Sequence, residues 1–349
     1  MFQTISSQEK IAFIKNLSVM LKSGVAINEA LANLAEQARS KKFSQILFQI
    51  KERIEKGASL SDAFSKYPKI FDRIFLSLVL SGENSGTFEE NFDFAADWLD
   101  RENDLKREIR SATLYPKIVL SATLILGVLL TTYVLPKLVP IFTQFEVELP
   151  LVTRIVFSIS IFFKDFWWLV ITGLILFFTG YILLKKINIV NSFLDALYIK
   201  IPVFGTLIKE YQLALISQIF FTLFKSGLHA QEILNVVGEA VTNNSYKKSI
   251  ALISRRIELG AKISDVIKNY PNLYPKQFVT ILIVGEKSGT LTDSFKYLAE
   301  FYLKEVRSKT KNLPVIIEPL LLIFMALIVC LVAFAIVLPI YQLTLFVSS

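Results

Sequence analysis

The sequence predicts an all-α membrane protein made of two repeated cytoplasmic helical bundles, of about six helices each, and three transmembrane helices. Three observations predict this class. The chain repeats itself at an offset of 203 residues, three long segments are apolar and uncharged, and the other segments carry helix-boundary residues without the polar–apolar alternation typical of strands.

The repeat is read from short segments that return in one register. Lys22-Ser23-Gly24 returns as Lys225-Ser226-Gly227. Gly82-Glu83-Asn84-Ser85-Gly86-Thr87 returns as Gly285-Glu286-Lys287-Ser288-Gly289-Thr290. Because no gap is needed between these landmarks, the chain contains one module twice.

The composition limits the possible functions. Hydrophobic residues make up 53% of the 349 residues, which is high for a soluble protein. The single cysteine, Cys330, excludes an intramolecular disulfide and a cysteine-rich metal site, and the single histidine, His229, excludes a multi-histidine metal centre. We therefore predict no catalytic, cofactor-binding or metal-binding residues, and no enzyme.

Three apolar segments are long enough to cross a membrane as helices, namely residues 118–135, 166–184 and 319–341. The first and third are repeat mates, that is, they lie 203 positions apart. The second has no partner in the repeat. It returns the chain across the membrane, so that both modules lie on the same side.

The distribution of charge predicts the topology. Residues 1–117 hold 17 Lys and Arg against 16 Asp and Glu, and residues 185–314 hold 18 against 10. The basic residues gather beside the apolar segments, which places both modules and the N-terminus in the cytoplasm and the C-terminus outside. This position of the excess charge does not favour nucleic-acid binding.

The predicted domains follow from the repeat, hydropathy and charge. Residues 153–163 place apolar side chains at helical spacing, which favours an amphipathic helix on the outer membrane face. In chain order the domains are a first cytoplasmic helical domain (7–116), transmembrane helix 1 (117–139), an extracytoplasmic loop with the amphipathic helix (140–165), transmembrane helix 2 (166–184), a second cytoplasmic helical domain (205–314) and transmembrane helix 3 (315–341).

Helix-boundary residues divide the first module into six predicted helices. Ser6 and Glu9 form a capping box at the start of the first helix, and Gly24 ends it. Asn28 is predicted to cap the second helix. The others are predicted at 42–57, at 62–67, at 72–80 with an end at Gly82, and at 88–110, which Thr87 and Glu90 open.

A set of residues along nearly the whole chain resembles the type II secretion system F family, the platform proteins of type II secretion, type IV pilus and competence machines. The start of the chain, almost directly at the first module, resembles competence-type or otherwise minimal members. The matching residues are Lys22-Ser23-Gly24, the turns at 82–87 and 285–290, Tyr115-Pro116, Leu149-Pro150 with Thr153-Arg154, Ile201-Pro202 with Gly205, and Glu318-Pro319.

The resemblance implies a non-enzymatic, multi-pass platform in the bacterial cytoplasmic (inner) membrane. It implies a cytoplasmic hexameric ATPase, pilin-like or pseudopilin subunits, other inner-membrane assembly components and membrane lipids as partners, and a homo-oligomer. The sequence is compatible with secretion, pilus and competence systems alike. An oligomeric transporter or channel component with cytoplasmic regulatory domains is the alternative, although three spans without a polar stripe are few for a pore.

The two glycine turns have two possible roles. A Walker loop needs a lysine after its second glycine, which these turns lack. In one interpretation Gly82 and Gly86, and likewise Gly285 and Gly289, permit a tight turn before a helix that Thr87 or Thr290 caps. In the other, Glu83 and Glu286 contribute to a surface for the ATPase or for self-association.

Glu318 and its repeat mate Tyr115 stand at the cytoplasmic ends of two apolar segments. A carboxylate at membrane depth is costly and is therefore a functional candidate. Glu318 is either an interfacial group satisfied by a neighbouring helix or water, or it contacts another span or the positive N-terminus of a pilin-like subunit.

Overall fold

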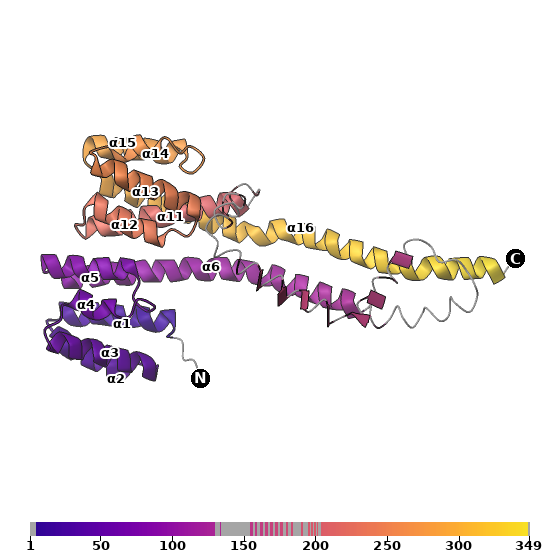
Figure 1. The fold of residues 1–349 in the computed structure, drawn as a ribbon, viewed down its shortest axis with the longest axis horizontal. Helices are drawn as coiled ribbons and strands as arrows, with labels where there is room; N and C mark the ends of the chain where they lie inside the picture. Colours follow the sequence, from indigo (N-terminus) through magenta and orange to yellow (C-terminus); the bar gives the residue numbers. More distant parts are fainter. Residues whose placement is uncertain are drawn as a thin grey trace. The chain divides into compact units, whose positions relative to one another are not determined.

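The computed structural model describes residues 5–129 and 204–347 continuously, and scattered positions between them (Figure 1). The described residues form twelve helices and contain no strand. The predicted all-α class is therefore confirmed.

Both modules contain the same succession of helices. Five helices of the second module, α12 to α16, begin 203 residues after their counterparts, which confirms the register of the repeat. The first module contains α1 (Ser7–Lys22), α2 (Ile27–Gln37), α3 (Lys41–Glu55), α4 (Leu60–Ser65), α5 (Arg73–Ser85) and the start of α6 (Phe88–Leu129). The second contains α11 (Phe204–Lys225), α12 (Ala230–Ala240), α13 (Asn244–Glu258), α14 (Ile263–Ile267), α15 (Lys276–Ser288) and the start of α16 (Leu291–Val347).

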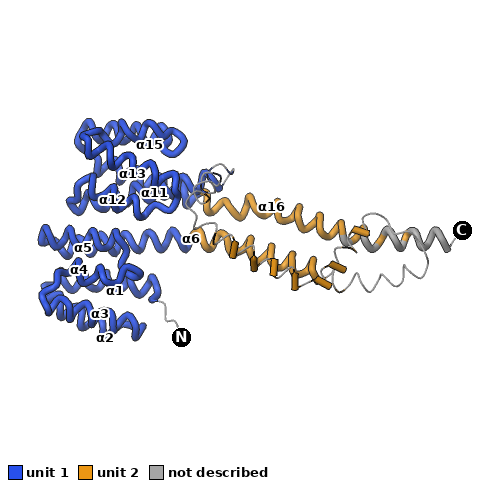
Figure 2. Tube along the Cα trace, viewed as in Figure 1, with its two compact units in different colours: residues 1–107, 192–308 blue, residues 108–191, 309–349 orange. Residues whose placement is uncertain are grey.

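The chain divides into two compact units (Figure 2). Unit 1 contains residues 1–107 and 192–308, and thus both modules. Unit 2 contains residues 108–191 and 309–349, and thus the outer parts of α6 and α16.

Each module has an aromatic core. In module 1, Phe64 packs edge-on against Phe71 and Phe75, with ring centroids 4.6 and 5.1 Å away. In module 2 the repeat mate of Phe71 is Tyr274, whose hydroxyl lies 2.8 Å from Ser249 Oγ. Burial raises the pKa of Tyr274, so the phenol stays neutral and its hydroxyl needs this partner.

Several predicted helix boundaries are wrong, among them the end of the sixth helix, which was predicted at 110 although α6 continues to Leu129. Asn28 does not cap α2, because Ala26 is the N-cap and Asn28 lies in the first turn. Gly82 does not end α5, because the helix continues to Ser85 and ends at Gly86, whose φ is 73°. In addition, Ser59 caps α4, so this helix begins two residues earlier than predicted.

Three described helices are long and apolar enough to cross a membrane: α6, α11 and α16. The most apolar windows of α6 and α16 are 0% and 6% buried. The two helices include residues 118–129 of the predicted first span and 319–341 of the predicted third span. That of α11 is 61% buried, because α11 is a core helix of module 2. Of the predicted second span, 166–184, and the loop 140–165, only scattered positions are described, so neither prediction is tested.

Gly82 allows α5 and α6 to approach closely, and Gly285 does the same for α15 and α16. A Cβ on Gly285 would meet the side chain of Ser294, with 2.9 Å to its Cβ. A Cβ on Gly82 would lie 3.3 Å from Cβ of Asn91 and Cα of Phe88. Both contacts are tight, and that of Gly285 is the tighter.

We predict that Gly285→Ala lowers the free energy of unfolding by about 1–3 kcal/mol, because α16 must move away from α15. Gly82→Ala should cost less, since the better helix propensity of alanine offsets a milder overlap. Denaturant unfolding of both variants measures this. Equal or increased stability of Gly285→Ala would contradict the close approach.

Candidate functional site

Glu83, a candidate site residue, caps the N-terminus of α4. Its Oε1 accepts a hydrogen bond from the backbone N–H of Leu60 at 2.8 Å. Its Oε2 accepts from the N–H of Ser61 at 3.3 Å and from Ser61 Oγ at 2.5 Å. A helix start leaves several N–H groups without an intrahelical partner, and the carboxylate satisfies two of them.

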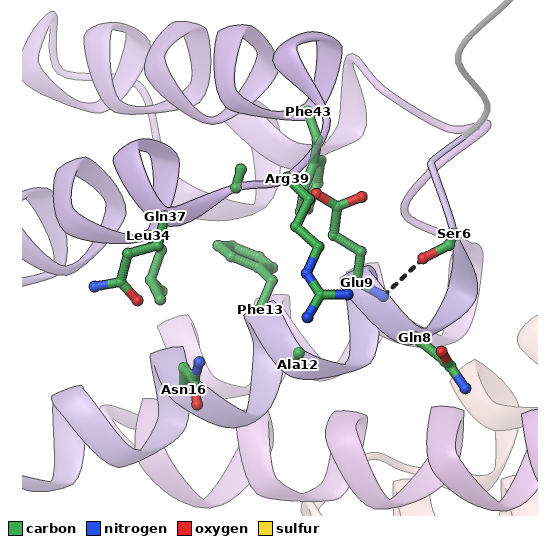
Figure 3. A pocket seen from close by; sticks show the side chains of 11 residues that line it. Ser6, Gln8, Glu9, Ala12, Phe13, Asn16, Leu34, Gln37, Arg39 and Phe43 are labelled. Atoms are coloured by element: carbon green, nitrogen blue, oxygen red, sulfur yellow. Dashed lines mark hydrogen bonds between the residues drawn. The ribbon is translucent and has the colours of Figure 1, made fainter.

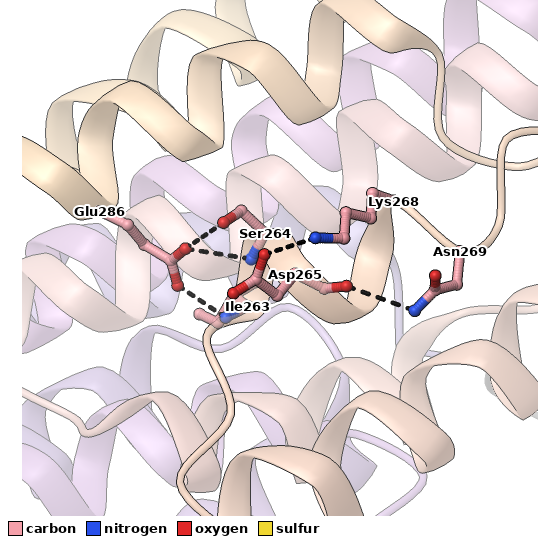
Figure 4. A network of polar contacts seen from close by, with 6 residues as sticks. All are labelled: Ile263, Ser264, Asp265, Lys268, Asn269 and Glu286. Atoms are coloured by element: carbon pink, nitrogen blue, oxygen red, sulfur yellow. Dashed lines mark hydrogen bonds and ion pairs between the residues drawn. The ribbon is translucent and has the colours of Figure 1, made fainter.

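Glu286 makes the same contacts in module 2 (Figure 4). Its Oε1 accepts from the N–H of Ile263 at 2.6 Å, and its Oε2 accepts from the N–H of Ser264 at 3.1 Å and from Ser264 Oγ. The repeat therefore preserves a joint in which the last turns of α15 hold the start of α14.

The second glycine of each turn supplies the left-handed backbone that ends the helix. Gly86 and Gly289 both have φ of 73°, a conformation that side chains other than glycine disfavour. The N–H groups of Thr87 and Thr290 donate to the carbonyls of Gly82 and Gly285, at 3.1 and 2.8 Å. This geometry places Gly86 and Gly289 in tight turns; a role of Glu83 and Glu286 in partner binding stays a prediction.

The other residues considered in the sequence analysis lie outside these turns. Tyr115 is 52% exposed on α6, and Glu318 is exposed on α16, both within unit 2. His229 is the exposed N-cap of α12, and its N–H donates to Glu232 at 3.4 Å. Among the described residues no group of His, Cys, Asp and Glu could hold a metal ion.

Within unit 1, the two modules meet through a polar contact that the sequence analysis did not identify. Ser81 Oγ on α5 donates to the carbonyl of Ser226, which follows α11, at 2.6 Å. Arg73 Nε on α5 lies 3.8 Å from Glu239 Oε1 on α12. Lys225 Nζ lies 4.6 Å from the centroid of the Phe94 ring on α6.

An apolar contact continues the same interface along α6. Trp98 and Leu105 of α6 are 3% and 5% exposed and surround, with Tyr211 and Leu215 of α11, a gap of only about 20 Å³. Burial raises the pKa of Tyr211, so its ring enters the interface as a neutral phenol. α5 and α6 of module 1 thus pack on α11 and α12 of module 2.

The corresponding surface of module 1 is open. A cavity of about 310 Å³ lies beside α1, with Gln8 and Ala12 among its lining residues (Figure 3). The repeat mates of these two residues are Tyr211 and Leu215. The bulkier side chains stand in the module that has a partner, and the smaller ones in the module that has none within the described chain.

We predict that Glu286→Ala lowers the stability of module 2 by about 1–2 kcal/mol, because two N–H groups of α14 lose their acceptor. Glu286→Gln should cost less, since its amide oxygen still accepts. Thermal unfolding measures the loss, with the exposed Glu300→Ala as the matched control. A Glu286→Ala protein as stable as Glu300→Ala would contradict the capping role.

Comparison with known proteins agrees with the repeat. The sequence profile of "Type II secretion system (T2SS), protein F" matches residues 13–136 and 216–339, two segments 203 residues apart. PilC, a type IV pilus assembly protein of Thermus thermophilus, is 29% identical over 330 residues, 95% of this chain and 81% of that protein. Type II secretion system protein F of Pseudomonas aeruginosa is 23% identical over 339 residues, 97% of this chain and 84% of that protein. The chain therefore belongs to the type II secretion system protein F family.

Proposed function

We propose that this protein is a non-enzymatic inner-membrane platform of a secretion or type IV pilus assembly machine. It links a cytoplasmic ATPase to the extraction and assembly of pilin-like subunits. Its relatives are type IV pilus assembly and type II secretion proteins, which supports the general assignment. The main observation that supports a link between the ATPase and subunit extraction is that α6 is one continuous helix.

Helix α6 joins a cytoplasmic module to an apolar segment without a break. It has 42 residues and is therefore about 63 Å long. Its first part is buried in module 1 through residues such as Phe92 and Leu99, whereas its apolar window is 0% buried. In module 2, α16 repeats this arrangement over 57 residues. We propose that a displacement of either module is transmitted along the same helix to its apolar half.

The joint between each module and its long helix is closely packed. Gly82 packs against α6, Glu83 holds α4, and Gly86 ends α5 immediately before α6 begins. A push on α4 or α5 is thus transmitted to α6 rather than absorbed by a loose loop. A platform that moves subunits out of a bilayer requires this transmission.

We predict that a flexible break in α6 uncouples the module from the membrane segment. Ser111→Gly, Ala112→Gly and Leu114→Gly together weaken the helix by about 1 kcal/mol per glycine. Filament assembly or secretion should be lost while the protein level and its copurification with the ATPase persist. The matched control is Ser111→Ala with Leu114→Ala, which keeps the helix and should keep assembly. Normal assembly by the glycine variant would contradict transmission of movement through α6.

We also propose that the Glu318 carboxylate attracts the positive N-terminus of a pilin-like subunit. Opposite charges interact strongly where water is scarce. Glu318→Gln is expected to lower filament yield about tenfold, which corresponds to about 1.4 kcal/mol. Electron microscopy and sheared-filament assays measure the yield at equal protein level. Tyr115→Phe at the repeat mate is the control, and an equal yield from Glu318→Gln would refute the role.

A further inference from the structure

We propose that the face formed by α15 and α16 of module 2 binds the face formed by α1 and α2 of module 1 in a second copy of this chain. This contact would repeat, between two chains, the interface that joins the two modules within one chain. It needs no ATPase and no pilin-like subunit, so it stands or falls separately from the proposed function.

The interface within the chain joins two different surfaces. Module 1 contributes α5 and α6, and module 2 contributes α11 and α12. In a duplicated module, such a heterologous contact leaves one example of each surface outside the interface. These are the α15–α16 face, called here the outer face of module 2, and the α1–α2 face, called the outer face of module 1.

The ion pair of the internal interface has repeat mates of the same signs. Arg73 and Glu239 correspond to Lys276 and Glu36. Both mates are exposed, Lys276 on α15 and Glu36 on α2. A second chain in the equivalent position would bring this ammonium and this carboxylate together.

The cation–π contact also has repeat mates. Lys225 and Phe94 correspond to Lys22 and Tyr297, and Lys22 pairs with Asp93 of its own module. Tyr297 is 52% exposed, although its ring stacks on Phe301 with centroids 6.2 Å apart. A half-exposed aromatic pair on a cytoplasmic helix face is costly in water and favours a protein partner.

The open cavity of module 1 fits the aromatic side of this partner. In the internal interface, Trp98 lies beside Tyr211 and Leu215. The mate of Trp98 is Phe301, and the mates of the other two are Gln8 and Ala12, which line the cavity of about 310 Å³. In the equivalent arrangement Phe301 of one chain reaches this cavity in the other.

Exposed lysines on the outer face of module 2 can meet exposed glutamates on the outer face of module 1. Each face also carries the other sign, with Asp293 and Glu300 on the first and Lys15 and Lys22 on the second. Opposite charge speeds encounter and fixes the register of the contact, and salt screens it. The lysines are Lys276, Lys287 and Lys304 on the first face, and the glutamates are Glu29 and Glu36 on the second.

Disulfide trapping tests the contact in the full chain. Ser81 and Ser226, which are in hydrogen-bond contact, correspond to Val284 and Ser23, both exposed. Two differently tagged chains, both with Cys330→Ala, carry Val284→Cys in one and Ser23→Cys in the other. A disulfide needs Cα atoms within about 7 Å, so the equivalent contact should link the two tags at least about tenfold more than a distant pair.

Two matched pairs control this experiment. Ser81→Cys with Ser226→Cys in one chain should link internally, which shows that the fold and the oxidation are intact. Val284→Cys with Glu52→Cys, on an exposed part of α3, reports random collision. No link between the tags, or a link no stronger than that of the collision pair, would overturn the proposal.

Charge reversal gives a second, independent measurement. Lys276→Glu or Glu36→Lys alone should reduce the oligomeric fraction in lipid nanodiscs or detergent several-fold, because like charges would meet. The double variant Lys276→Glu with Glu36→Lys should restore it. Thermal unfolding checks that each variant is folded. Failure of the double variant to recover the oligomer would exclude this pairing of faces.

Discussion

The architecture depends on a carboxylate that joins the end of one helix to the start of another. α4 and α14 have six and five residues, too few to be stable by themselves. Glu83 and Glu286 supply the acceptors that their first N–H groups lack. Without these acceptors, the short helices would expose unpaired donors beside the core, and the packing of each module around its long helix would weaken.

The residue before each glutamate performs a different task on an adjacent face. Consecutive residues of a helix point about 100° apart, so Gly82 can face α6 while Glu83 faces α4. The glycine has no Cβ, and α6 therefore approaches α5 closely enough for direct contact. The Gly-Glu pair thus fixes two neighbouring helices at once, which explains why the turn is so similar in the two modules.

The sequence predicted those features that depend on local chemistry or on the repeat. Gly86 and Gly289 lie in turns between two helices as expected, and the offset of 203 residues holds in the helix boundaries. The prediction that Asn28 caps the second helix was wrong, because the presence of a residue type that favours capping does not decide where a helix begins. The prediction that the fifth helix ends at Gly82 was wrong, because a glycine inside a helix can also allow close packing against a neighbouring helix.

The contact between the modules could not be derived in this way, because burial of a helix face depends on tertiary structure. A comparison of the repeat mates does contain a signal. Lys15 forms an ion pair with Asp100 at 2.5 Å, whereas their mates are Gln218 and Leu303, which line the interface gap. The loss of charged residues in one copy of a repeat indicates the copy whose face is covered.

Differences between repeat mates also affect the relative strength of the internal interface and of the proposed contact between chains. The internal interface buries Trp98 and Leu105, whose mates on the outer face are Phe301 and Ser308. Less apolar area and more charge make the proposed contact between chains weaker and more sensitive to salt than the internal one. The modules of one chain would then stay together while neighbouring chains separate and rejoin. The permanent joints would then lie within the chain and the reversible ones between chains.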